Sequence, residues 1–343
     1  MGSRDDEPIG LALFGLGRAG FVHFKNVINN PRCRLKYIVD EDTTKVDALL
    51  SRYHLTDVKS LSPNSAATAY DDPCVSAVIV SSPTFTHEEI VQSALNHGQG
   101  VFCEKPVSET IQGTEACYQA AEKARRPLLC SFNRRFDPSV QGIRERVRSG
   151  EIGKVHVIKT CSRDHPLPEI QFLSTSGGMF RDCAVHDLDT VCWILGEYPN
   201  SVFVRATVHD EGIAGLNDVD TVAIVMTFPS GILALTDLSR HATYGYDQRV
   251  EVNGAEGMIM SENQVPHGIV GYTKQGIYSS VYKHSFPQRY AESYIGAIDH
   301  FFSVLQGTEP IIVKRDETIK VSILAAACEE SYRTGLPVNV IYN

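Results

Sequence analysis

The first third of the chain alternates short apolar runs with segments whose apolar residues recur every three or four positions. The apolar runs predict buried strands, and they cover residues 9–17, 34–40, 76–82, 100–106 and 127–132. The segments between them predict amphipathic helices and cover residues 19–29, 44–55, 87–98 and 110–124. Apolar strands that alternate with helices are typical of parallel βαβ units. We therefore expect an N-terminal doubly wound parallel sheet of the Rossmann type.

The pattern changes after about Phe132. Strand-like runs with turn signals between them now follow one another, at residues 154–162, 201–209, 220–228, 231–239 and 249–254. Helical segments interrupt them at residues 185–195, 290–305 and 318–334. Their alternation predicts a largely antiparallel sheet. The expected fold class is α/β plus α+β, with a cofactor domain at residues 1–131 and a substrate-binding and oligomerisation domain at residues 132–343.

Composition narrows the class of partner. The 343 residues are 43% hydrophobic and 21% charged, which is typical of a globular protein. A net charge of -9 argues against nucleic acid or an anionic membrane surface as a partner. The nine cysteines form no C-x-x-C pair, and no apolar run reaches the roughly 20 residues of a membrane span. We expect reduced thiols in a cytoplasmic protein.

A glycine-rich turn follows the first predicted strand. It matches the pattern G-x-G-x-x-G and consists of Gly15, Leu16, Gly17, Arg18, Ala19 and Gly20. Because it joins a strand to a helix, the pattern predicts a dinucleotide site with the diphosphate at the helix N-terminus. Asp40 ends the second strand, where its carboxylate can accept hydrogen bonds from both ribose hydroxyls of NAD. Glu41 and Asp42 follow and would repel a 2′-phosphate, so we expect NAD over NADP.

Further candidates lie at the carboxyl ends of the next strands. Ser82 and Pro83 end the third strand, and His87 follows as either a contact to the cofactor or a polar residue in the first turn of a helix. Glu104 and Lys105 end the fourth strand. Lys105 can reach the nicotinamide and the substrate from there, while a solvated turn is the alternative interpretation.

The second candidate constellation lies between Gly177 and Asp189. Asp182 and His186 are four residues apart on a predicted helix and share a face. A carboxylate one turn from an imidazole can orient it as a general base. A capping carboxylate beside a half-buried histidine is the alternative. No H-E-x-x-H and no second histidine at ligand spacing are present, so we expect no metal.

Together these motifs resemble the Gfo/Idh/MocA oxidoreductase family, and within it the inositol 2-dehydrogenases. The resemblance covers nearly the whole chain. It rests on the glycine turn, Asp40, the segments at 81–89, 104–106 and 132–138, the G-G-x3-D-x3-H-D-x-D run at 177–189, and residues 244–258.

The resemblance implies hydride transfer from a cyclic polyol, such as myo-inositol, to NAD. It implies that His186 is the general base, that Asp182 orients it, and that Lys105 hydrogen-bonds the reacting oxygen. It also implies that the second domain presents an open-faced sheet for a homodimer or homotetramer.

The departures from the family lie in the substrate pocket. Bacterial inositol dehydrogenases carry a His and an Asn at the positions of Ser162 and Asp164. Because these positions help to select the substrate, the resemblance leaves the identity of the polyol undecided. Arg163, Asp164, Tyr244 and Arg289 are candidate substrate contacts. The alternatives are a dehydrogenase or reductase of another sugar or sugar derivative, an NAD-binding sensor without catalysis, and a metal-dependent glycoside hydrolase that uses NAD transiently.

Overall fold

The computed structural model describes residues 7–342, and this part of the chain folds into two compact units. The first comprises the residues up to Phe132 together with Tyr294–Ile319, and the second comprises Asn133–Ser293 together with the residues from Lys320 onward. The expected boundary between residues 131 and 132 lies one residue from the observed one. Tyr294–Ile319, which the sequence analysis assigned to the second domain, packs in the first unit.

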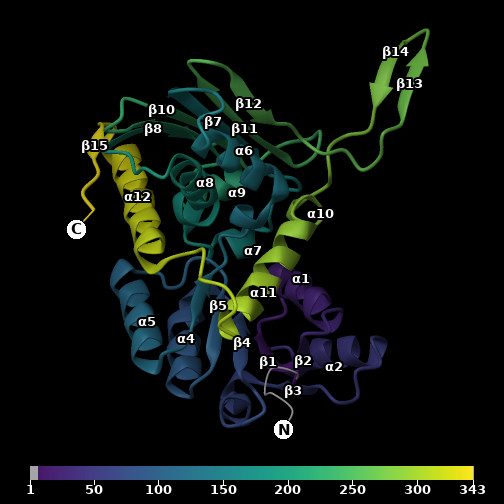
Figure 1. The fold of residues 1–343 in the computed structure, drawn as a ribbon. Helices are drawn as coiled ribbons and strands as arrows, with labels where there is room; N and C mark the ends of the chain where they lie inside the picture. The colour runs from purple at the N-terminus through teal and green to yellow at the C-terminus, as the bar shows by residue number, and fades with distance from the viewer. Residues whose placement is uncertain (1–6, 343) are drawn as a thin grey trace. The chain divides into compact units, whose positions relative to one another are not determined.

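The first unit is a parallel sheet of six strands in the order β3-β2-β1-β4-β5-β6, with helices on both faces (Figure 1). Its strands are β1 (Ile9–Phe14), β2 (Cys33–Val39), β3 (Lys59–Leu61), β4 (Ala77–Val80), β5 (Gly100–Cys103) and β6 (Leu128–Cys130). Its helices are α1 (Arg18–Ile28), α2 (Thr43–Arg52), α3 (Ala67–Tyr70), α4 (His87–Asn96) and α5 (Ile111–Ala124). Every residue of β1, β4 and β5 is buried, because helices cover both faces of a parallel sheet.

Two helices each begin in one unit and end in the other, α11 (Ala291–Leu305) and α12 (Arg315–Thr334). The end of α11 packs on the parallel sheet, where the ring of Phe301 lies edge-on to that of Phe102. Asn30 donates to the carboxylate of Asp299 over 2.7 Å. These contacts explain why the segment joins the first unit although Asn133–Ser293, which belongs to the second unit, lies between it and Phe132 in the chain.

The second unit contains a seven-stranded sheet in the order β12-β11-β7-β10-β9-β8-β15. Its strands are β7 (Val155–Arg163), β8 (Ser201–Thr207), β9 (Thr221–Thr227), β10 (Leu233–Ser239), β11 (Asp247–Gly254), β12 (Met258–Ser261) and β15 (Val338–Asn339). A hairpin of β13 (Val270–Thr273) and β14 (Gly276–Ser279) projects from it (Figure 1). The helices are α6 (Pro138–Arg148), α7 (Ile170–Leu173), α8 (Val185–Leu195), α9 (Glu211–Ala214) and α10 (Phe286–Arg289).

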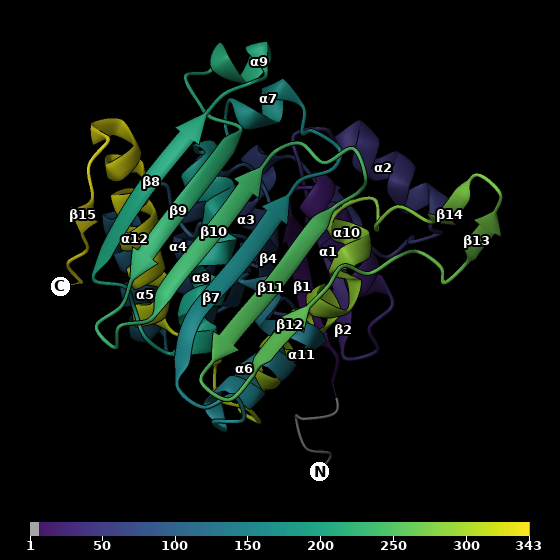
Figure 2. The ribbon, with the colours of Figure 1, turned by 90° about the horizontal axis from the view of Figure 1, so that it is seen from above.

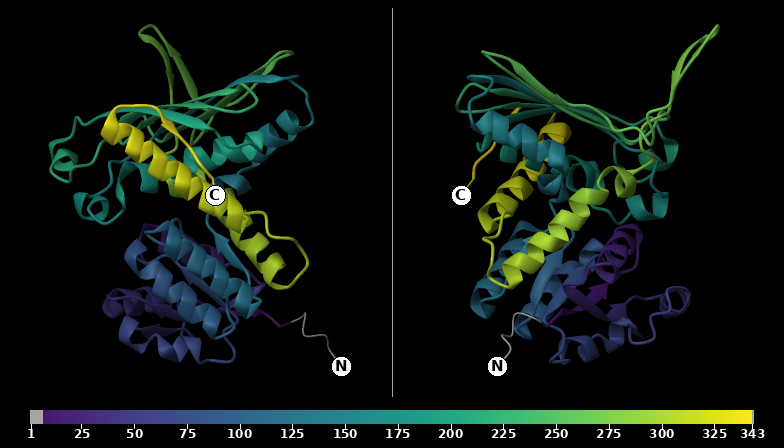
Figure 3. Two further views of the ribbon diagram at one scale, coloured as in Figure 1. Left: turned by 90° about the vertical axis from the view of Figure 1, so that its left-hand side faces the viewer. Right: turned by 45° about the vertical axis from the view of Figure 1, so that its right-hand side comes forward.

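The seven-stranded sheet is covered by helices on one face only (Figures 2 and 3). Buried and exposed residues therefore alternate along β9, and Val225 on that strand is exposed, as are Leu233 and Leu235 on β10. The strands pair antiparallel except β7 and β10, which run parallel. The expected fold class is confirmed, and the single parallel pair is a feature that the alternation pattern could not predict.

All nine cysteines are free thiols, and most are buried. Within residues 7–342, no helix is both long and apolar enough to cross a membrane.

Candidate active site

The glycine turn after β1 leaves space for a ligand on its outer side. Gly15 has a φ of +86°, and a Cβ there would lie 2.4 Å from the backbone nitrogen of Ser82. A Cβ at Gly20 would lie 2.1 Å from the carbonyl oxygen of Gly15. A Cβ at Gly17, the residue before α1, would meet no atom within 4 Å. The turn is therefore open at Gly17, directly before the N-terminus of α1, and this suits a diphosphate.

Asp40 joins this turn to the loop after β2. Its Oδ2 accepts the backbone N–H of Leu16 over 2.6 Å, and its Oδ1 accepts that of Asp42 over 3.0 Å. Lys45 on α2, which the sequence analysis did not identify, donates from Nζ to the carbonyl oxygen of Leu16 over 2.8 Å. The carboxylate of Asp40 is thus held at the glycine turn with lone pairs that can accept ribose hydroxyls.

His87 is 1% exposed, and both of its ring nitrogens face carbonyl oxygens. Nδ1 lies 2.7 Å from the oxygen of Pro106, and Nε2 lies 2.8 Å from that of Ser82. Burial lowers the pKa of His87 and outweighs the two carbonyls, which raise it. The neutral ring donates to one of them. It bridges the segments that end β4 and β5, and this arrangement favours a positioning role over contact with a cofactor phosphate.

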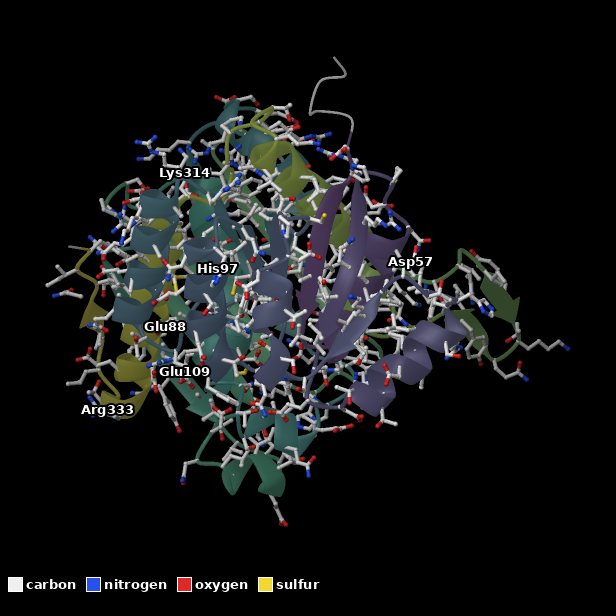
Figure 4. The ribbon with its side chains drawn as sticks, turned by 90° about the horizontal axis from the view of Figure 1, so that it is seen from below. Asp57, Glu88, His97, Glu109, Lys314 and Arg333 are labelled. Atoms are coloured by element: carbon white, nitrogen blue, oxygen red, sulfur yellow. The ribbon has the colours of Figure 1, made fainter. Side chains whose placement is uncertain are left out.

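Lys105 follows β5, and the residues beside it in the chain have well-defined partners. Glu104 is buried and points away from solvent, accepting hydrogen bonds from His23 over 2.7 Å and from Ser131 over 3.0 Å. Burial alone would raise the pKa of Glu104, but the charge and hydrogen bond of His23 lower it. Glu88, labelled in Figure 4, accepts the hydroxyl of Ser108 over 2.8 Å. Lys105 is half-buried and lies at the carboxyl edge of the sheet, directly after β5 and Glu104.

In the second unit the helix with the expected base begins abnormally. Gly177 and Gly178 both have positive φ, and residues Phe180–Ala184 form a π-helical turn before α8. Asp182 lies in that turn and His186 in the first turn of α8, so the sequence expectation of α-helical spacing is corrected here. A π turn is wider than an α turn and is frequent at functional sites. Asp182 and His186 are both half-buried.

The neighbouring carboxylates have buried cationic partners. Asp187 accepts from Ser162 over 2.8 Å and lies 3.1 Å from Arg134. Asp189 pairs with Arg135 over 2.6 Å, and both side chains are 1% exposed. Arg134 and Arg135 come from the segment at 132–138, for which the sequence analysis offered no role. Their pairing separates two structural carboxylates from the accessible pair of Asp182 and His186.

Arg240, directly after β10, is surrounded by three carboxylates. It is fully buried, and its Nη1 donates to Oδ2 of Asp182 over 3.2 Å. Asp164 and Asp218 each lie 3.9 Å from its guanidinium. Burial alone would lower the pKa of Arg240, but Cys183 and the three carboxylates raise it. The sequence carries no signal for this residue, because nothing in its surroundings marks it as buried.

The structure distributes the candidate substrate contacts differently. Asp164 lies beside Arg240 and Asp182. Arg163 is the next residue to Ser162, which faces α8, so Arg163 points to the open face of the sheet. There it pairs with Asp237 and donates to the hydroxyl of Tyr244 over 3.1 Å, which donates to Asp247 over 2.9 Å.

Arg289 is buried and donates to Asp137 over 2.6 Å. Asp137 also caps the N-terminus of α6. These two contacts favour a structural role for Arg289. Among the described residues, no group of three or more His, Cys, Asp or Glu side chains is arranged to hold a metal ion.

Two family models match most of the chain. Residues 9–132 match the oxidoreductase family with an NAD-binding Rossmann fold, and residues 140–260 match the GFO/IDH/MocA C-terminal domain. The chain belongs to the GFO/IDH/MocA oxidoreductase family. The resemblance expected from the motifs is confirmed, and so are the enzyme class, an NAD-dependent dehydrogenase, and the cofactor, NAD. The open turn before α1 and the position of Asp40 fit that cofactor.

Several relatives of this family are similar over nearly their full length. The inositol 2-dehydrogenase of Rhizobium meliloti is 34% identical over 93% of this chain and 95% of its own. The myo-inositol 2-dehydrogenase of Thermotoga maritima is 35% identical over 94% and 95%. A crystal structure of a myo-inositol dehydrogenase from Corynebacterium glutamicum superposes with a TM-score of 0.89 at 29% identity, covering 98% of this chain and 99% of that one.

Proposed function

We propose that this dehydrogenase oxidises a ring hydroxyl of a cyclic polyol, myo-inositol or a related inositol, with His186 as general base. The observation that carries the proposal is that Asp182 and His186 are both half-buried in one helical segment. The other carboxylates of that segment, Asp187 and Asp189, are each paired with a buried arginine. The relatives named as inositol dehydrogenases support the substrate class.

In this proposal each residue of the site has a separate role in the reaction. The glycine turn and Asp40 would hold NAD, which would supply the hydride acceptor when bound. A ring nitrogen of His186 takes the proton of the hydroxyl, and Asp182 orients the imidazole. Lys105 donates a hydrogen bond from Nζ to the reacting oxygen and stabilises the negative charge that develops on it.

Turnover tests this function. We would mix the protein with NAD at about pH 9 and follow absorbance at 340 nm with inositol isomers, aldoses and sugar acids. A signal confined to myo- or scyllo-inositol is the expected result. A signal confined to another sugar derivative would replace the substrate and keep the chemistry. NAD binding without any turnover would overturn the proposal in favour of a sensor.

Variants test the roles of the residues. His186→Ala should lower kcat on the order of 10²–10⁴-fold with NAD affinity nearly unchanged, because it removes a general base. Lys105→Ala should also lower kcat. Exposed residues of the first unit provide matched controls, His97→Ala and Lys314→Ala (Figure 4). An unchanged kcat in His186→Ala would refute the assignment.

We also propose that the open face of the seven-stranded sheet joins copies of the chain into a homodimer or homotetramer. The side chains of Val225, Leu233 and Leu235 support this, since they expose apolar surface and such patches often mark protein–protein interfaces. Sedimentation of the wild type and of Leu235→Glu tests it. A monomer in both would overturn it. The nine free thiols support a cytoplasmic location.

A further inference from the structure

The buried guanidinium of Arg240 joins three segments of the second unit. Its Nη1 contacts Asp182 in the π-helical turn directly, over 3.2 Å. Its Nη2 lies 3.9 Å from Asp218, whose other carboxylate oxygen accepts the backbone N–H of Met179 over 3.0 Å. Asp164, just after β7, lies 3.9 Å from Nη1.

The backbone of Arg240 is fixed as well. Its N–H donates to the carbonyl oxygen of Asp220 over 2.8 Å, and its side chain is 1% exposed. Within residues 7–342, neither Nε nor Nη2 has a hydrogen-bond partner. A buried cation with unused donors is costly unless carboxylates lie close by, so the three carboxylates and the guanidinium hold one another in place.

The π-helical turn makes such a hold necessary. Its bonds run from i to i+5 and are rare outside single turns, so the direction of the Asp182 side chain depends on what that side chain touches. Arg240 contacts Asp182 itself and, through Asp218, the residue just before the π turn. The cation thus fixes both the start of this turn and its one half-buried carboxylate.

We propose that Arg240 is the positioning residue of this dehydrogenase and holds the carboxylate of Asp182 in the orientation that it needs to act on His186. This inference rests on the proposed function, since it assigns a role toward the base in that reaction. Arg240 does not touch the substrate in this proposal and acts only through Asp182.

Substitution of Arg240 tests the role. Arg240→Gln should lower kcat on the order of 10–100-fold, by analogy with the loss of hydrogen-bond partners that orient metal-ligating side chains. NAD affinity should stay within about twofold. Arg240→Lys keeps the charge and should recover part of kcat. Arg146→Gln, the same change at an exposed arginine of α6, is the matched control and should behave like the wild type.

The pH profile separates positioning from loss of packing. Without the cation, the carboxylates of Asp164, Asp182 and Asp218 repel one another, and the charged form of His186 is favoured. The acid limb of kcat/KM should therefore move to higher pH in Arg240→Gln and stay in place in Arg240→Lys. A protein that is only partly folded would lose amplitude without any shift of the limb.

A double-mutant cycle decides whether the effect passes through Asp182. In an Asp182→Asn background, Arg240→Gln should cost less than about threefold further, since the partner charge is already gone. Equal losses in both backgrounds, or a wild-type profile in Arg240→Gln, would overturn the inference. If the wild type turns over no polyol at all, the proposed function fails first, and the role of Arg240 in it fails with it.

Discussion

Asp182 and Asp189 lie seven residues apart in the same helical segment. Replacing each carboxylate by its amide should affect stability and turnover to different extents. Asp189 is 1% exposed and accepts three hydrogen bonds from Arg135, over 2.6, 3.0 and 3.2 Å. Asp182 is half-buried and shares Arg240 with two other carboxylates. Asp189→Asn should therefore lower stability and leave turnover intact, whereas Asp182→Asn should mainly lower turnover and cost less stability than Asp189→Asn.

The magnitudes follow from what each change leaves behind. Asp189→Asn leaves the guanidinium of Arg135 buried without a counter-charge, and removing one partner of a buried pair costs about 3–5 kcal/mol. The amide oxygen still accepts one hydrogen bond, so we expect the lower end of that range. Asp182→Asn removes one charge-assisted hydrogen bond, about 1–2 kcal/mol, because Arg240 keeps Asp164 and Asp218.

The single tryptophan, Trp193, provides the assay. Its ring lies 5.8 Å from the guanidinium of Arg135, so its fluorescence reports on the helix that carries Asp189. Urea unfolding gives the free energy of unfolding, and NADH formation per folded protein gives kcat. Arg135→Met combined with Asp189→Leu should regain stability relative to Asp189→Asn, because no lone charge stays buried. A loss below about 1 kcal/mol for Asp189→Asn, or a kcat loss larger than that of Asp182→Asn, would refute the reasoning.

Three further predictions concern the cofactor edge and the thiols. Asp40→Ala should weaken NAD about tenfold and narrow the ratio of the NADP and NAD dissociation constants, since it removes a carboxylate from the ribose site; equal affinities for NAD before and after would show that another residue holds the ribose. Because burial lowers the pKa of His87, the unfolded chain takes up a proton below about pH 6.5 that the folded chain does not. The wild type should therefore lose stability relative to His87→Gln as the pH falls from 8 to 5, and parallel curves in urea unfolding would contradict this. Ellman's reagent should modify exposed Cys74 first, since burial raises the pKa of the half-buried thiols of Cys33 and Cys161 to about 12 and about 11; rapid reaction of several thiols in the native protein would be inconsistent with the structure.

The parallel sheet of the first unit could be predicted from the sequence because its signals are local. Apolar runs, helical periodicity and the glycine turn each lie within a dozen residues of chain. The parallel pairing of β7 with β10 joins strands about 75 residues apart, from Val157–Leu233 to Arg163–Ser239, and no local pattern encodes it. The assignment of Tyr294–Ile319 to the first unit likewise depends on long-range contacts such as that of Asn30 with Asp299.

The candidate site was predictable in its residue types but not in its partners. Spacing put Asp182 and His186 in one helical segment, and strand ends put Lys105 and Asp40 at the carboxyl edge of the parallel sheet. Arginine is rarely buried unless it is paired, so its type alone gives Arg135 and Arg240 a surface position. Their burial becomes visible only once carboxylates distant in sequence are seen around them, such as Asp189, 54 residues from Arg135.

The buried arginines also explain how one short helical segment can contain three carboxylates whose charges are balanced to different extents. The inner carboxylates, Asp187 and Asp189, each have an arginine of their own, so their charge does not reach the solvent side. Asp182 shares its arginine with two other carboxylates, so the charge around it is net negative. In the reaction proposed above, that charge would favour a protonated imidazole on His186 after the substrate proton has been taken. The number of arginines per carboxylate, rather than the spacing of the carboxylates, would then decide which end of the segment can do proton chemistry.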